Sequence, residues 1–260
     1  MKKKSSRRSE RPERDDPPEI EGLSEDSDRS EGEPRLETAE RLEGGRITAL
    51  EPQRRAGRVS LFLDGRFACG LSEETALIHG LSVGRDLSNE EMETLLGSEE
   101  VRRARNAAYL LLSFRARSGA EIEKRLVQKG FPIALVKEIT DELAAAGLLD
   151  DPAFAEAWIR NRRETRPKGK ALLRWELRRK GVPSETVESA LDSIEPEDEL
   201  ESARALASRQ WERMKDPDPA ARIRRIAALL QRRGYSWDTI REATASLEEL
   251  SRGDEPWEES

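Results

Sequence analysis

The chain has one cysteine, Cys69, and one histidine, His79. A single cysteine cannot form a disulfide within the chain, and we expect a cytoplasmic protein. One cysteine and one histidine also cannot supply the ligand set of an ordinary zinc site. A nucleophile with a histidine base would have to use His79, and no partner motif surrounds that residue. These scarcities predict a protein that is not an enzyme and that holds no metal and no cofactor.

The sequence also lacks the motifs of membrane spans, signal peptides and phosphate-binding loops. No stretch approaches the roughly 18 apolar residues of a membrane span, and no apolar stretch of the kind found in signal peptides follows residues 1–6. Neither of the common glycine-rich phosphate motifs occurs. Asp150 and Asp151 could bind a cation, but Pro152 follows at once, and a helix cap is the favoured interpretation. The sequence therefore predicts no membrane contact and no nucleotide loop.

Charge is abundant but of mixed sign. Charged residues make up 38% of the chain and hydrophobic residues 35%, so we expect a modest core and a heavily charged surface. The net charge of −7 and a pI near 5.2 argue against a generic DNA-binding protein. Residues 1–43 contain few apolar side chains and cannot bury enough surface to offset chain entropy. We expect them to form a disordered, acidic, low-complexity tail.

A glycine turn that occurs three times dominates the sequence. Gly130, Gly181 and Gly234 each follow a basic residue and lie about fifty residues apart. Spacings of three and four residues put apolar side chains on one helix face, and glycine after the last turn ends a helix with positive φ. Each unit is therefore predicted to be a helix, a glycine turn and a second helix, preceded by a further helix. The apolar residues eight and four before each glycine, and six and nine after it, are Ile122, Leu126, Val136 and Ile139, then Leu173, Leu177, Val187 and Ala190, then Ile226, Leu230, Ile240 and Ala243.

A different pattern precedes these units. Short strands are predicted at residues 47–50, 59–63 and 66–69. Asp64-Gly65, between the last two, is a strong signal for a β-hairpin. We expect a three-stranded antiparallel sheet. Short helices should follow at residues 72–79, at 88–96 behind a capping box, and at 104–114.

The expected fold is mainly α, with three tandem three-helix repeats in an elongated stack. A small antiparallel β-sheet region and the disordered N-terminal tail precede the stack. The expected boundaries are residues 1–43 for the tail, 44–100 for the sheet region, 101–149, 150–195 and 196–252 for the three repeats, and 253–260 for a loose acidic tail.

Basic residues gather in the helix before each glycine turn, and acidic residues gather in the helix after it. Residues 160–180 contain ten basic side chains and two acidic ones. If the units stack in register, the basic helices align along one side, which suits a phosphate backbone or a groove in a protein assembly. Local ion pairs on solvated helix faces are the alternative for each residue. The candidate partner- or DNA-binding residues are Arg115, Arg117, Lys124, Arg125, Arg162, Arg163, Arg166, Lys168, Lys170, Arg174, Arg178, Arg179, Arg224 and Arg225.

Two details refine this candidate surface. Trp175 lies two residues before Leu177, so it should point away from the apolar stripe and toward its basic neighbours. Few acids lie near the crowded basic residues of the second unit, which are Arg162, Arg163, Arg166, Lys168, Lys170, Arg178 and Arg179. Of these, Arg166, Lys168 and Lys170 fall in a predicted loop. Replacing all three by glutamate should therefore weaken partner binding and leave the fold intact.

Motifs that occur together in one known family are found in four stretches, at residues 109–118, 150–159, 176–182 and 233–240. They resemble the signatures of the first, second and third helical repeats of the RecX family, bacterial regulatory proteins that modulate the RecA recombinase. Residues 64–67 match the hairpin extension of longer members. The resemblance covers about residues 46–250; the long acidic head is a departure, as is an alanine at position 116 where the family often has proline.

The resemblance implies a mostly helical, elongated protein that binds in the groove of the RecA filament. It implies inhibition of the RecA ATPase and strand exchange, and hence a role in recombination, DNA repair and the SOS response. The implied partners are the RecA filament and, more weakly, single- or double-stranded DNA, and we expect a monomer. The alternative is a free-standing DNA-binding protein whose helix pairs act like helix-turn-helix modules. A helical-repeat adaptor for another partner is a third interpretation.

Overall fold

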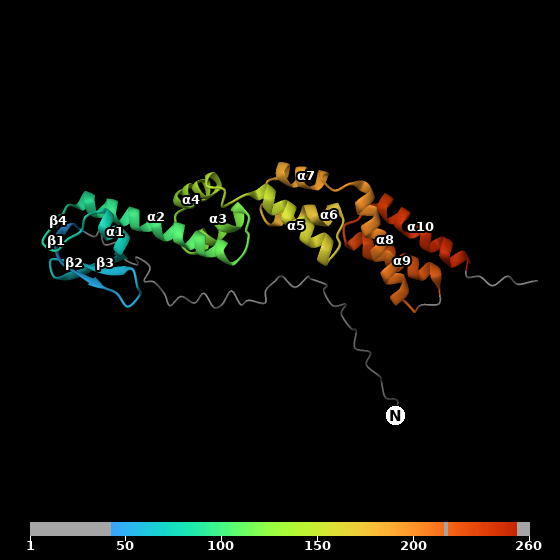
Figure 1. Ribbon diagram of the computed structural model, residues 1–260, viewed down its shortest axis with the longest axis horizontal. Helices are drawn as coiled ribbons and strands as arrows, with labels where there is room; N and C mark the ends of the chain where they lie inside the picture. The colour runs from blue at the N-terminus through green and yellow to red at the C-terminus, as the bar shows by residue number, and fades with distance from the viewer. Residues whose placement is uncertain (1–42, 216–217, 254–260) are drawn as a thin grey trace, which may run out of the picture.

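The computed structural model describes residues 43–215 and 218–253, which form four strands and ten helices. Residues 1–42, 216–217 and 254–260, which include most of both predicted tails, lie outside the described residues. Figure 1 shows the sheet at one end and the helices following in chain order along the long axis. The predicted elongated, mainly helical stack behind a small sheet is confirmed.

An antiparallel sheet forms the first part of the described chain. Its strands are β1 (Gly45–Pro52), β2 (Arg58–Leu63), β3 (Arg66–Ser72) and β4 (Asp86–Leu87), in the order β3-β2-β1-β4. Asp64 and Gly65 join β2 to β3 with φ values of 48° and 78°, as a type I′ turn requires, and the predicted hairpin is confirmed. The expectation of three strands is wrong, because two residues at the edge of β1 pair with β4. A two-residue strand has no alternation that a sequence pattern could reveal.

The helix α1 (Glu73–Ile78) is followed, after β4, by α2 (Asn89–Phe114). The predicted capping box at Ser88 and Glu91 is present at the start of α2. The expectation of two helices, at 88–96 and 104–114, is wrong, because α2 runs unbroken through 26 residues. Gly97 lowers helix propensity by about 1 kcal/mol but cannot end a helix flanked by good helix formers. As a result α2 crosses residue 100 and extends from the sheet region into the first helical repeat.

Glu99 fastens α2 to the sheet region. Its carboxylate is buried, and it accepts hydrogen bonds from the Ser72 amide at 3.1 Å and the Thr75 hydroxyl at 2.8 Å. Arg58 of β2 donates to it at 3.3 Å and Arg102 of α2 at 2.9 Å. Because removing one partner of a buried charge is costly, this site holds the sheet against α2.

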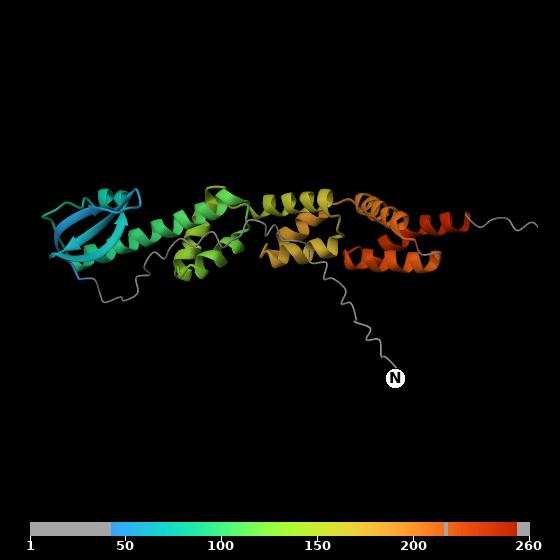
Figure 2. The same cartoon turned by 90° about the horizontal axis from the view of Figure 1, so that it is seen from below.

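The other helices form three units. The first unit is the C-terminal half of α2 with α3 (Gly119–Gln128) and α4 (Ile133–Ala145). The second consists of α5 (Asp151–Thr165), α6 (Lys170–Arg179) and α7 (Ser184–Asp192), and the third of α8 (Pro196–Arg213), α9 (Pro219–Arg232) and α10 (Trp237–Gly253). Each unit has its own buried hydrophobic cluster, and a fourth cluster lies between the sheet and the start of α2. Figure 2 shows these groups following one another along the axis.

The predicted glycine turns are confirmed. Gly130, Gly181 and Gly234 have φ values of 93°, 79° and 84°, and all twelve predicted apolar positions around them are buried. In each turn the amide after the glycine donates back to a carbonyl five residues earlier, which satisfies an otherwise unpaired helix carbonyl. These hydrogen bonds join Phe131 to Leu126 (3.2 Å), Val182 to Leu177 (3.1 Å) and Tyr235 to Leu230 (3.2 Å).

Neighbouring units meet head to tail at two junctions. In the first junction, residues 180–181 of the second unit lie against residues 118–121 at the start of α3. In the second junction, residues 233–235 of the third unit lie against residues 169–172 at the start of α6. The turn of one unit thus contacts the start of the middle helix of the unit before it, twice in the same way.

Candidate partner-binding surface

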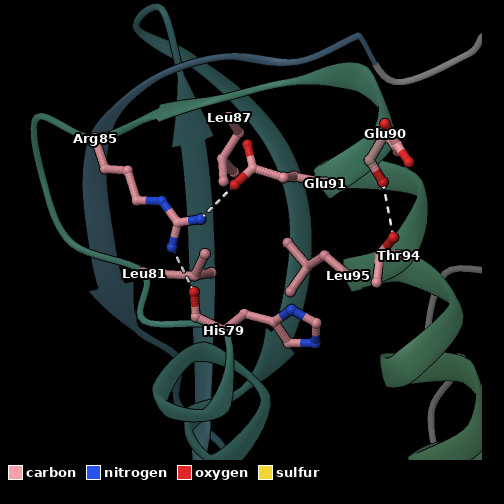
Figure 3. A pocket seen from close by; sticks show the side chains of 8 residues that line it. All are labelled: His79, Leu81, Arg85, Leu87, Glu90, Glu91, Thr94 and Leu95. Atoms are coloured by element: carbon pink, nitrogen blue, oxygen red, sulfur yellow. Dashed lines mark hydrogen bonds and ion pairs between the residues drawn. The ribbon is translucent and has the colours of Figure 1, made fainter.

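The hollow between α1, β4 and α2 has a volume of about 240 Å³, and the side chain of His79 lines it (Figure 3). The His79 carbonyl accepts a hydrogen bond from Arg85 at 2.5 Å, and Arg85 also donates to Glu91 at 2.6 Å. The hydrogen bond from the Ser88 amide, and then the Arg85 guanidinium, lower the pKa of Glu91. Arg85 and Glu91 therefore hold the loop before α2 in place, which is a structural role.

Cys69 is buried in β3, and burial raises the pKa of its thiol to about 12, so it is a poor nucleophile at neutral pH. Within residues 43–215 and 218–253 no group of three or more His, Cys, Asp or Glu side chains is placed to hold a metal ion. Over the same ranges no helix has the length and apolar character of a membrane span.

Both acids at the start of α5 act as helix caps, and the predicted cap at Asp150 is confirmed. Asp150 accepts a hydrogen bond from the Ala153 amide at 2.8 Å and starts α5. Asp151 accepts one from the Gly119 amide at 2.9 Å, which lies at the start of α3 in the preceding unit. This second cap across the first junction was not predicted, because the contact spans 32 positions of sequence.

Glu176 of α6 is the centre of a buried charged cluster in the second unit. Its carboxylate accepts hydrogen bonds from the Trp158 indole at 3.0 Å, from Arg162 at 3.1 Å and from the ammonium of Lys168. The guanidinium of Arg162 lies 4.2 Å from the centre of the Trp158 ring. Burial alone would raise the pKa of Glu176, but the hydrogen bonds from Lys168 and Trp158 and the nearby positive charges outweigh it and lower that pKa.

The structure corrects the expectation for the loop before α6. Lys168 is only 7% exposed and points into the cluster around Glu176, so it is not a free surface charge. Arg166 and Lys170 are half-buried, and Lys170 is already the first residue of α6, where its amide donates to Glu199 at 2.8 Å. Replacing Lys168 by glutamate would put two carboxylates together inside the unit. The premise that these three residues are free loop charges is therefore wrong, and we now expect the triple glutamate variant to be destabilised.

Acids on other helices pair several of the predicted basic residues. Arg174 and Arg178 of α6 share Glu188 of α7, at 2.7 and 3.0 Å, and Arg163 pairs with Asp198 of α8 at 2.8 Å. The statement that few acids lie near this stretch is therefore wrong, because these acids are close in space and distant in sequence. Exposed pairs of this kind contribute about 0–1 kcal/mol each, so they leave the charges available to a partner.

The first and third units place their candidate residues at the surface or near it. Arg115 pairs with Glu121 at 3.1 Å, Arg117 donates to the Leu111 carbonyl at 3.0 Å, and Arg125 donates to Gln128 at 3.4 Å. Lys124 is exposed on α3. In the third unit Arg224 lies 3.7 Å from Asp218, and Arg225 is exposed on α9.

The exposed side of α6 carries an aromatic and basic pair. Trp175 is 53% exposed, as its position relative to the apolar stripe predicted. The Arg179 guanidinium lies 5.2 Å from the centre of the Trp175 ring, one helical turn away. Among the described residues no carboxylate pairs with Arg179, so this surface offers a π face and a positive charge to a partner.

Known proteins match this architecture domain by domain. The regulatory protein RecX N-terminal domain matches residues 45–88, and the first, second and third three-helix domains of RecX match residues 104–143, 150–191 and 197–244. Regulatory protein RecX of Halalkalibacterium halodurans is 32% identical over 217 residues, 82% of this chain and 82% of that protein. The RecX of Mycolicibacterium vanbaalenii is 40% identical over 139 residues, 51% of this chain and 76% of that protein.

A solved structure agrees with the sequence comparisons. The crystal structure of a regulatory protein RecX superposes with a TM-score of 0.60 at 26% identity, and the match covers 80% of this chain and 99% of that chain. The four domain matches, the relative that matches over 82% of both chains, and this fold similarity lead to one assignment. The chain belongs to the RecX family of regulatory proteins.

Proposed function

We propose that this protein is a non-enzymatic, cytoplasmic regulator that binds the groove of the RecA–DNA filament as a monomer. Its main effect is inhibition of the ATPase and strand exchange of RecA, and so of recombination and the SOS response. Membership of the RecX family supports this proposal. The observation that carries it is the linear arrangement of the sheet region and three helical units, because a row of similar units suits a long, repetitive partner.

The distribution of charge also favours a protein filament over bare DNA. The helices α3 and α6 carry basic side chains, whereas α4 and α7 carry exposed acids such as Glu138, Asp141, Glu185 and Asp192. In the view of Figure 1, α4 and α7 lie above α3 and α6. A surface of both signs complements a protein groove, whereas DNA is uniformly negative and would be repelled by the acidic helices.

The test is the rate of ATP hydrolysis by RecA on single-stranded DNA at increasing concentrations of this protein. We expect the rate to fall to a low plateau. The binding of a fluorescent oligonucleotide is measured in parallel without RecA. An unchanged hydrolysis rate at saturating protein would refute the proposal.

A second candidate, free-standing DNA binding, rests on Trp175 and Arg179. An exposed aromatic ring beside a basic residue is a platform on which nucleic acid bases stack. This function predicts tight oligonucleotide binding without RecA, with an affinity that falls steeply as salt is added. Weak oligonucleotide binding together with strong inhibition of the ATPase favours the filament.

A further inference from the structure

The first junction is built mainly from backbone groups and short side chains. The Ser118 hydroxyl donates to the Lys180 carbonyl at 2.5 Å, and the Lys180 ammonium donates to Glu121 at 2.8 Å. The carbonyl end of α6 therefore faces the amide end of α3, so the helix dipoles meet with opposite sign. At the centre of the contact, Gly181 lies against the methyl group of Ala120.

The second junction repeats this arrangement. The Gly169 amide donates to the Arg233 carbonyl at 2.9 Å, and the Ala171 amide donates to the Gly234 carbonyl at 3.2 Å. The carbonyl end of α9 thus faces the amide end of α6. Both hydrogen bonds join backbone atoms directly, so they fix the distance between the two backbones.

Four glycines differ in whether they are needed for a positive φ, for close packing between units, or for both. A methyl group added to Gly181 would overlap the side chain of Ala120, and one added to Gly234 would overlap Leu172. Gly130 forms the same turn in the first unit but has open space where its methyl group would lie. Gly169 has an ordinary φ of −74°, yet a methyl group there would overlap the backbone of Gly234. Glycine is therefore required at Gly130 for φ, at Gly169 for close contact, and at Gly181 and Gly234 for both.

We infer that Gly169, Gly181, Gly234 and Ala120 are positioning residues, which fix the distance and bend between units and thereby the spacing of the partner-binding surface. The buried clusters belong to single units, so the orientation of the units depends mainly on these small contacts, together with a few polar contacts between units such as Arg163 with Asp198. A small displacement at a junction therefore shifts the whole three-helix unit beyond it, and the shift grows with distance from the junction. This inference rests on the proposed function, since the spacing matters only for a partner that several units contact together.

The test measures distances across each junction in the full chain. Cys69 is buried, so spin labels attach selectively to introduced cysteines at exposed positions. Ala145→Cys with Ser189→Cys spans the first junction, and Ser189→Cys with Ser208→Cys spans the second. Each pair is combined with single glycine-to-alanine substitutions, and the inhibition of RecA is measured on the unlabelled variants.

We expect Gly169→Ala to change the distance across the second junction, and Gly181→Ala to change the distance across the first. Either change should raise the concentration for half-inhibition about tenfold. Gly130→Ala is the matched control, because it imposes the same strain of positive φ outside a junction. It should lower the melting temperature and leave both distances unchanged.

A rescue variant separates packing from loss of folding. Ala120→Gly removes the methyl group that the new side chain in Gly181→Ala would overlap, so the double variant should regain the wild-type distance and most of the inhibition. An unchanged distance in Gly169→Ala and Gly181→Ala, or changed distances with wild-type inhibition, would overturn the inference. Absence of inhibition by the wild type would refute the proposed function instead, and the distances would still decide whether the glycines set the bend.

Discussion

The carboxylate of Glu176 holds three donors inside the second unit, and its removal should be costly. Glu176→Gln leaves the buried ammonium of Lys168 without a counter-charge. We expect a loss of about 3–5 kcal/mol in the free energy of unfolding, measured by urea denaturation followed by circular dichroism. Glu164→Gln, an exposed change on the neighbouring α5, is the control and should shift stability by less than about 0.5 kcal/mol. Equal midpoints for the two variants would contradict the role assigned to Glu176.

The same residue should make stability depend on pH. Burial raises the pKa of Glu99, Glu121 and Glu176, but hydrogen bonds from basic neighbours outweigh burial, so each folded pKa lies below the ordinary 4.5. A lowered pKa stabilises the folded state above pH 4.5, and this contribution is lost as the pH falls through the folded value. The free energy of unfolding, measured between neutral pH and about pH 3, should therefore fall steeply at acidic pH. In Glu176→Gln the free energy of unfolding should fall less steeply with pH. Identical slopes for this variant and the wild type would rule out a contribution from the titration of Glu176.

At the scale of single elements, two glycines should respond in opposite directions to the same change. Gly97 lies inside α2 with open space around it, so Gly97→Ala should stabilise the protein by about 0.5–1 kcal/mol. Gly130 has a φ of 93°, so Gly130→Ala should destabilise it by about 1–2 kcal/mol. Thermal melting followed by circular dichroism checks both. A loss of stability in Gly97→Ala would mean that α2 is not continuous at that point.

Elements with strong local signals were predictable from the sequence, and elements defined by distant contacts were not. The glycine turns and the Asp64-Gly65 hairpin follow from backbone preferences that act within a few residues. The strand β4 exists because it pairs with β1 about forty residues earlier, so its own two residues carry no signal. The continuity of α2 has a weak local signal, because Gly97 lowers helix propensity, whereas the contacts that hold this stretch join Glu99 of α2 to Ser72 and Thr75, distant in sequence.

For the whole molecule, the surface of α6 should matter more to the partner than the surface of α4. Trp175→Ala with Arg179→Glu removes an exposed ring and reverses a charge without touching a buried cluster. We expect inhibition of RecA to weaken about tenfold, because exposed aromatic and arginine residues contribute most to interfaces. Circular dichroism should be unchanged.

The matched control lies on the opposite, acidic side of the first unit. Ile133→Ala with Lys137→Glu also removes an exposed apolar side chain and reverses one charge, and it should leave the inhibition near the wild-type level. Stronger loss of inhibition in this control than in the α6 variant would move the contact surface to α4.

The basic residues of this surface could be listed from the sequence, but their surroundings could not. Lys168 and Arg179 belong to the same basic stretch, yet one is buried against Glu176 and the other covers Trp175. Helical periodicity decides which face a residue occupies within its own helix. The partners of Arg174 and Arg163 come from α7 and α8, and only the packing of whole helices brings them close.

The separate hydrophobic clusters also determine what a spectroscopic reporter can detect. The first tryptophan of the chain is Trp158, and Trp158, Trp175, Trp211 and Trp237 lie in the second and third units. Selectively excited tryptophan emission therefore reports on these two units and is silent for the sheet region and the first unit. Units that share no core need not unfold together. An emission melt therefore follows one half of the molecule and a far-ultraviolet melt follows all of it, and the difference between the two curves isolates the unfolding of the tryptophan-free half.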